Sequence, residues 1–275
     1  MRQALFALLL LLAAGPAAAQ GIPEALRGTW AQGACTAPTD LLHLAARSVV
    51  RLPAEGPARL LRLRSLRPLG DWTLGTAAGA EAPRLLLRAA GAALETMEPD
   101  AKLRDDRLPG DTPVRRWQRC NVPPPALAAL HGEGLAVLGA LERLEAACQE
   151  GTTPPCLAAL VAVGDVSGDG LLGVAEVARL LRGVAWAMAA QDAGTPEALA
   201  TAVGLGSIAA LAAARLLVEG LDFDGDGRLS AAELGQDRAA WPAAGGSAEG
   251  RPVTLEALAE GAGLLRALLE RLASQ

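Results

Sequence analysis

The sequence predicts an α+β multidomain protein in which a small antiparallel β-barrel or sandwich precedes an all-α domain. Of the 275 residues, 51% are hydrophobic, which is enough to bury a core and argues against disorder. Residues 21–125 include 15 basic and 11 acidic side chains, whereas residues 126–275 include 9 and 19. Prolines at 123–125 mark this change of charge and make a stiff spacer. We therefore expect a β-domain over residues 21–122, a Pro-rich linker over 123–133 and a helical domain over 134–275.

The first nineteen residues are expected to be a signal peptide. Arg2 precedes an apolar stretch from Ala4 to Ala14, and alanines at 17–19 precede Gln20. A basic start, a short apolar stretch and small residues at the cleavage point are typical of exported proteins. The stretch is too short for a membrane span of about 20 residues. We therefore predict a secreted or periplasmic protein with no stable membrane span after cleavage.

Four cysteines follow the predicted signal peptide. An even number in a chain bound for an oxidising compartment favours disulfides over reactive thiols or a metal cage. Three pairings are possible. We prefer Cys35 with Cys120 and Cys148 with Cys156, because each bond then stays within one predicted domain.

The β-domain is predicted from short apolar segments that glycine and proline separate. Residues 61–64 (Leu-Arg-Leu-Arg) alternate with a period of two, which is the pattern of a half-buried strand. About eight such segments in roughly a hundred residues favour a small antiparallel barrel or sandwich. Other segments of this kind are residues 41–44, 49–52, 72–74, 85–87 and 114–118.

Two short motifs of this domain resemble the ends of lipocalin-like barrels. Residues 28–30 (Gly-Thr-Trp) resemble their Gly-x-Trp start, and Arg115, Arg116 and Arg119 resemble their closing arginine. The resemblance implies a barrel that holds a small apolar ligand. The alternative is a filled barrel in which the tryptophan closes one end and an arginine lies over its ring.

The second half is predicted to be helical. Leu138, Leu141 and Leu144 recur at helical spacing. A threonine before a proline occurs at residues 153–154 and 195–196, a pattern typical of a cap followed by the first helical residue. Thr254 is expected to cap a last helix over residues 255–272.

Two twelve-residue acidic segments lie between these helical stretches. We name residues 165–176 loop one and residues 222–233 loop two. In such a loop positions 1, 3 and 5 turn their side chains inward, and glycine at position 6 permits a sharp bend. A hard cation of the size of calcium takes about seven oxygen ligands. The pattern therefore indicates a site for a divalent cation in each loop.

Both loops resemble the calcium loop of EF-hand proteins, which implies an all-α EF-hand domain with two bound calcium ions. In that family, side chains at positions 1, 3, 5 and 12 and the carbonyl at position 7 bind the ion, and position 9 binds directly or through water. The ligands implied for this chain are Asp165, Ser167, Asp169, Leu171 and Glu176 in loop one, and Asp222, Asp224, Asp226, Arg228, Ser230 and Glu233 in loop two.

The two loops do not match the EF-hand pattern equally well. Loop two matches at every ligand position, whereas loop one has Ser167 at position 3 and Gly173 at position 9, where water must serve. Loop one thus offers three carboxylates against four, so we expect it to bind calcium more weakly. Leu172 and Leu229 occupy position 8, where paired EF-hands join their loops by a short β-bridge.

The stretch between the loops permits two alternative interpretations. Residues 198–214 include no charged side chain, as in a membrane span, but glycines at 204 and 206 lower their hydropathy. A span would also place the loops on opposite sides of a bilayer, so we expect a buried helix. Trp186 and Met188 either line a groove that opens on ion binding or belong to the core.

The sequence contains no nucleophile elbow, phosphate loop, dinucleotide fingerprint or zinc-ligand spacing. His43 and His131 are expected to be surface or packing residues, and the net charge of −5 argues against nucleic acid as a partner. We predict an exported calcium-binding protein, not an enzyme, with a structural, buffering or sensing role. The alternative is a binding or inhibitor module whose β-domain recognises a small apolar ligand or a protein, with calcium only stabilising the fold.

Overall fold

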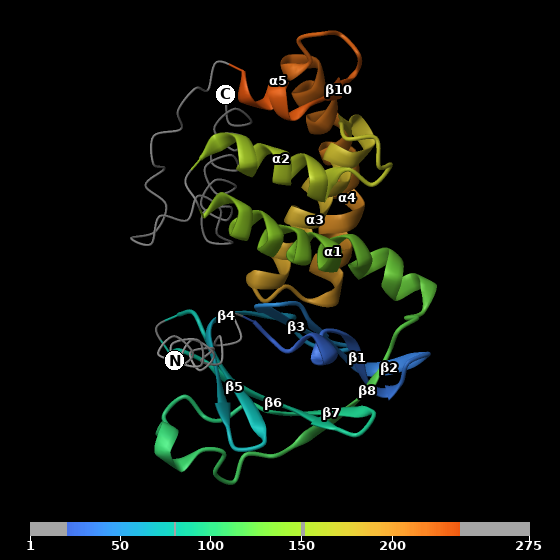
Figure 1. Ribbon diagram of the computed structural model, residues 1–275. Helices are drawn as coiled ribbons and strands as arrows, with labels where there is room; N and C mark the ends of the chain where they lie inside the picture. Colours follow the sequence, from blue (N-terminus) through green and yellow to red (C-terminus); the bar gives the residue numbers. More distant parts are fainter. Residues whose placement is uncertain (1–20, 80, 150–151, 237–275) are drawn as a thin grey trace, which may run out of the picture. The chain divides into compact units, whose positions relative to one another are not determined.

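The computed structural model describes residues 21–79, 81–149 and 152–236, over which the chain forms a closed eight-stranded antiparallel barrel and several helices (Figure 1). The α+β prediction with a barrel is therefore confirmed. The described residues form two compact units, one from residues 21–49 and 61–121, the other from residues 50–60 and 122–236. The predicted signal peptide and the predicted last helix at 255–272 lie outside the described residues.

The barrel has an up-and-down strand order that closes between its first and last strands. Trp30 lies opposite Arg119 and Ala31 opposite Gln118 at this seam. Each apolar segment predicted from the sequence overlaps a strand, and closure settles the choice between barrel and sandwich. The strands are β1 (Gly28–Ala34), β2 (Ala37–Leu44), β3 (Ser48–Pro53), β4 (Arg59–Leu69), β5 (Trp72–Ala77), β6 (Arg84–Ala90), β7 (Ala93–Met97) and β8 (Arg115–Arg119).

Buried hydrophobic side chains form the core of the barrel, which explains how a sequence rich in leucine and alanine forms strands. Leu85 and Leu87 of β6 belong to the main core, whereas Leu86 packs with Met97 in a second cluster that includes Leu108. Both faces of this strand are thus buried, so burial outweighs the weak strand propensity of leucine. The main core contains Ile22, Leu26, Trp30, Leu42, Leu44, Val49, Leu63, Ala77, Leu85, Leu87, Leu94 and Trp117.

The Gly-Thr-Trp motif and Arg119 meet as the filled-barrel alternative requires. The guanidinium of Arg119 lies 4.2 Å from the centre of the Trp30 ring, which is buried and donates to the Leu26 carbonyl. Gly28 has φ of 110°, and a Cβ there would lie 3.0 Å from Arg119. The packing supports a barrel closed by Trp30, and a small ligand for it stays a prediction.

The two disulfides join Cys35 to Cys120 and Cys148 to Cys156, which confirms the preferred pairing. Neither bond connects a residue before the proline run to one after it. Disulfides are typical of secreted and periplasmic proteins, which agrees with the predicted compartment.

From residue 122 onward, the described chain consists of helices and one short two-stranded sheet. The first helix begins at Pro125, inside the segment expected to be a linker, because a proline in the first turn lacks only an N–H that the helix does not use. Thr195 accepts a hydrogen bond from the Ala198 N–H, as expected of a cap. The elements are α1 (Pro125–Cys148), α2 (Thr153–Gly164), β9 (Leu172–Gly173), α3 (Val174–Gln191), α4 (Pro196–Leu221), β10 (Arg228–Leu229) and α5 (Ala231–Gly235).

Helices α1 and α3 pack closely around Trp186, which is fully buried. A Cβ on Gly134 would lie 2.1 Å from the Trp186 ring, so this contact requires glycine. The indole N–H donates to Nδ1 of His131, which burial keeps neutral by lowering its pKa to about 4. Trp186 therefore belongs to the core in this structure, and His131 is a packing residue.

Helix α4 differs from the buried helix that we expected. Leu199, Ala210, Ala214 and Val218 are buried, but Ile208, Leu211, Leu216 and Leu217 are exposed. Among the described residues, α4 is the one helix that is long and apolar enough to cross a membrane. Only 18% of its most apolar 18-residue segment is buried. The expectation of a buried helix is therefore wrong for one side of α4. The absence of charge from residues 198–214 did not show which side of the helix packs against other helices.

Candidate metal centre

Each acidic loop lies between two helices. Loop one connects α2 to α3, loop two connects α4 to α5, and the strands β9 and β10 pair within them. Leu172 lies opposite Leu229 in this pair, so the predicted β-bridge at position 8 is present. Both leucines are buried, and both belong to a hydrophobic cluster formed by residues of α2, α3, α4 and α5. The helices around the loops therefore hold the two loops side by side.

The backbones of the two loops repeat one another. Position 6 has φ of 82° in both Gly170 and Gly227, the left-handed region expected of the bend. Position 4 also lies there, with φ of 79° in both Gly168 and Gly225. The sequence prediction considered glycine only at position 6. The repetition of glycine at position 4 was a signal for this second turn.

The aspartate at position 1 holds the turn together from inside. In loop one Asp165 accepts backbone N–H groups from Gly168 at 2.6 Å and Gly170 at 2.7 Å. In loop two Asp222 accepts those of Gly225 and Gly227, each at 2.7 Å. The N–H of Gly170, followed by those of Gly168 and Asp169, holds the pKa of Asp165 below its usual value despite some desolvation.

The glutamate at position 12 closes each loop by reaching back to its start. Glu176 accepts the N–H groups of Val166, Ser167 and Gly173 at 2.7 to 2.9 Å. Glu233 accepts the equivalent groups of Phe223, Asp224 and Ser230 at 2.8 to 3.4 Å. The carboxylates at positions 1 and 12 are therefore turned toward the loop backbone in both copies.

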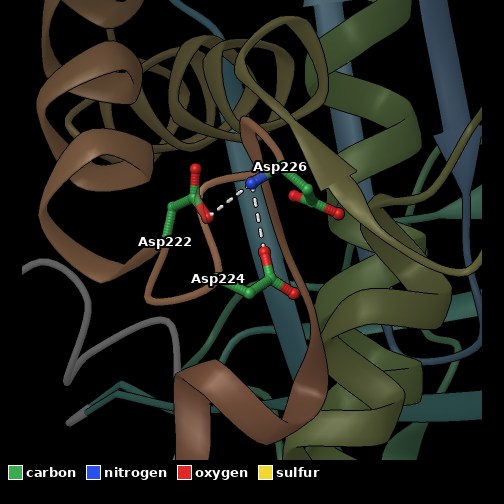
Figure 2. Close-up of side chains that lie close together, drawn as sticks. All are labelled: Asp222, Asp224 and Asp226. Carbon is green, nitrogen blue, oxygen red and sulfur yellow. Dashed lines mark hydrogen bonds between the residues drawn. The ribbon is translucent and has the colours of Figure 1, made fainter.

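The aspartates at positions 1, 3 and 5 of loop two gather at one point. One carboxylate oxygen from each of Asp222, Asp224 and Asp226 lies within 4.8 Å of the others, and Figure 2 shows the three side chains around the loop. The N–H of Asp226 donates to both Asp222 and Asp224. This concentration of oxygen atoms at the inner side of one turn suits a cation.

The charges of loop two repel one another. The N–H of Asp226 lowers the pKa of Asp224, but desolvation and the negative charges of Asp226, Glu233 and Asp222 together raise it above its usual value. By contrast, hydrogen bonds from the backbone and hydroxyl of Ser230 hold the pKa of Glu233 low. A bound cation would relieve the repulsion at Asp224.

Loop one has a different set of side chains around the same backbone. Ser167 at position 3 donates its hydroxyl hydrogen bond to Asp165, and Gly173 at position 9 has no side chain. Asp169 at position 5 forms an ion pair with Arg228 of loop two. The N–H groups of Ser167, Gly173 and Val166 hold the pKa of Glu176 low, although desolvation is the largest single influence and raises it.

The residues present fit a hard divalent cation. Every side-chain donor at the predicted positions is an oxygen, as calcium prefers, and neither loop contains the cysteine or histidine typical of a zinc site. Loop two brings its aspartates together and provides Glu233 and Ser230 at the other end. The ion pair between Arg228 and Asp169 was not predicted from the sequence, because 59 positions separate the two residues.

No protein-family model, curated protein or solved structure matches the chain. A functional assignment therefore depends on the geometry and chemistry of the two loops.

Proposed function

We propose that the protein is an exported calcium-binding protein with paired EF-hands and that loop two is its stronger site. The observation that supports this most directly is the convergence of Asp222, Asp224 and Asp226 oxygens within 4.8 Å of one another. Their mutual repulsion, expressed in the raised pKa of Asp224, favours a bound cation. The repeated backbone of loop one supports a second site of the same kind.

In this proposal the ligands in loop two are Asp222, Asp224, Asp226, Glu233, the carbonyl of Arg228 and Ser230, directly or through water. In loop one they are Asp165, Ser167, Asp169, Glu176 and the carbonyl of Leu171, with water at position 9. The ion would neutralise part of the negative charge of each loop. The chain itself supplies the turn, through its left-handed glycines, and the pairing of the loops, through β9 and β10.

Trp186 bears on the choice between a structural or buffering role and a sensing role. It is fully buried between α1 and α3, so a sensing role would require these helices to separate when the ion binds. Extracellular calcium modules bind with dissociation constants of about 10⁻⁴ to 10⁻³ M. A site with a dissociation constant of about 10 μM would stabilise the fold by about 2.7 kcal/mol at 1 mM calcium.

Thermal unfolding of the purified protein tests the proposal. We expect about 1 mM calcium to raise the midpoint by several degrees over excess EGTA, and magnesium at the same concentration to raise it less. The double variant Asp222→Asn, Asp224→Asn should lose most of the shift. The matched control, Asp71→Asn, removes an exposed carboxylate of the barrel unit and should keep it. Equal midpoints in EGTA and calcium would contradict the proposal.

A further inference from the structure

The positively charged side chain of Arg228, which belongs to loop two, forms an ion pair with Asp169 of loop one. We propose that the guanidinium of Arg228 competes with calcium for the carboxylate of Asp169 and thereby sets the calcium affinity of loop one. This inference rests on the proposed calcium binding and adds to it a residue that acts on one loop from the other. It concerns the side chain of Arg228, whereas the proposed ligand role of this residue in loop two belongs to its carbonyl.

The β-bridge places Arg228 beside loop one. Arg228 in β10 lies opposite Gly173 in β9, and Leu229 lies opposite Leu172. Gly173 presents no side chain at this position, so nothing from β9 stands between Arg228 and the loop. Arg228 Nη1 donates to Oδ2 of Asp169. Because buried leucines hold the bridge, the arginine is kept within reach of the carboxylate.

Asp169 has partners on both of its oxygens. Its Oδ1 accepts the N–H of Leu171 at 3.0 Å, and its Oδ2 accepts from Arg228. In loop two the equivalent Asp226 accepts the N–H of Arg228 at 2.8 Å, so this backbone bond is common to both loops. The guanidinium contact on Oδ2 is the feature of loop one that a calcium ion would have to share or displace.

The arrangement is asymmetric because position 7 is Arg228 in loop two but Leu171 in loop one. Loop two therefore receives no matching cation from loop one at this position. Loop one has three carboxylates with a guanidinium on one of them, whereas loop two has four. A divalent ion entering loop one meets less negative charge and an arginine that repels it.

The size of the effect follows from exposure. The side chains of Arg228 and Asp169 are 48% and 35% exposed, so solvent screens the ion pair and the ion can displace it. We expect removal of the guanidinium to tighten calcium binding in loop one by about two- to fivefold at low salt. The gain should shrink as added salt screens the charges.

Calorimetric calcium titration of the full chain tests this inference, with loop two silenced by Glu233→Gln so that loop one is measured alone. Adding Arg228→Gln, which keeps the carbonyl, should tighten loop one by the expected factor. The matched control is Arg215→Gln. Arg215 pairs with Glu219 on α4, so this substitution removes the same charge from an ion pair outside the loops. It should change the affinity by less than about twofold.

A second readout does not depend on calcium. In EGTA, the carboxyl carbon resonance of Asp169 should shift in Arg228→Gln and stay unchanged in Arg215→Gln. Equal loop-one affinities in the two arginine variants, or an unmoved Asp169 resonance, would overturn the role of Arg228 while leaving calcium binding intact. Absence of calcium binding to the unaltered protein would overturn the proposed function itself, and with it this inference.

Discussion

Loop one and loop two have the same backbone and different charge. Glycines at positions 4 and 6 have φ of 79° and 82° in both, and the carboxylates at positions 1 and 12 accept equivalent N–H groups. Loop two adds Asp224 and Ser230 where loop one has Ser167 and Gly173. One set of residues therefore shapes the turn, and another set determines its attraction for a cation.

The electrostatic consequences differ accordingly. In loop one, hydrogen bonds hold the pKa values of Asp165 and Glu176 low, and Arg228 pairs with Asp169. In loop two, the surrounding negative charges raise the pKa of Asp224. Hydrogen bonds also hold the pKa of Glu233 low in loop two, so the repulsion is concentrated at Asp224, where loop one has the uncharged Ser167. This difference is why we rank loop two as the stronger calcium site.

The largest expected effect is the loss of calcium binding by loop two in the variant Glu233→Gln. The substitution removes the charge that closes the loop and replaces an acceptor of the Phe223 or Ser230 N–H by a donor. Loss of outer-shell partners alone costs about 10- to 100-fold in metal affinity, so we expect about a hundredfold loss or more. Loop one should weaken by a smaller factor through the β-bridge. Isothermal titration calorimetry measures both sites.

Glu176→Gln is the matched variant for loop one. It should abolish the weaker site and leave the stronger one within about tenfold of its original affinity. Two equivalents of calcium bound with unchanged affinity in Glu233→Gln would show that the assigned ligands are wrong. A greater total loss in Glu176→Gln than in Glu233→Gln would reverse the ranking of the loops.

Acid should destabilise the helical unit, because His131 of α1 is buried against Trp186 of α3. Burial lowers the pKa of His131 to about 4, so the folded protein favours the neutral ring. The stabilising effect is complete above about pH 6.5 and is lost as the pH falls toward 4, because the unfolded chain takes up a proton first. The loss amounts to about 3 kcal/mol. Urea unfolding followed by circular dichroism measures it.

His131→Asn keeps an acceptor for Trp186 but removes the titration, so its stability should depend less on pH between about 4 and 6.5. His43→Asn is the matched control in the barrel unit, where His43 contacts Thr29. It should leave the pH dependence of the helical signal unchanged. An equally steep pH dependence in His131→Asn would remove His131 as the cause.

Ser167→Asp should make loop one resemble loop two at position 3. The fourth carboxylate is expected to tighten calcium binding in loop one by about tenfold, because affinity rises with ligand charge. The calcium-free protein should unfold at a lower temperature than the unaltered protein, since the new charge faces Asp165 and Asp169 without a cation. Titration and thermal unfolding in EGTA measure the two effects. A tighter site without apo destabilisation would contradict the repulsion argument.

Gly173→Ser is expected to have the smallest effect. A Cβ at Gly173 would meet no atom closer than Glu176 Oε2 at 3.7 Å, so serine fits. Its hydroxyl would provide the position 9 donor and cap α3, as Ser230 caps α5. We expect about a two- to threefold gain in affinity and a few tenths of a kcal/mol in stability. Unchanged affinity would show that water at position 9 serves as well as a hydroxyl.

Features with a local cause were predictable from the sequence. The strand segments and the left-handed glycine at position 6 of each loop depend on a few consecutive residues. The β-bridge between Leu172 and Leu229 was instead expected from the resemblance to paired EF-hands. The disulfide pairing followed from assigning Cys35 and Cys120 to one domain. Features that depend on contacts through space were not predictable: the pairing of Arg228 with Asp169 needs the bridge, and the exposed side of α4 needs the packing of its neighbours.

The Cys35–Cys120 bond lies at the seam where the barrel closes. Strands β1 and β8 pair over Trp30 and Ala31, and the Cys35–Cys120 bond joins the chain next to this short ladder. Without this bond, the last strand would be held to the first by the two-residue ladder and by the contact of Arg119 with Trp30. Because β1 and β8 are the strands farthest apart along the chain, the bond secures the contact that closes the barrel only after its last strand has been made.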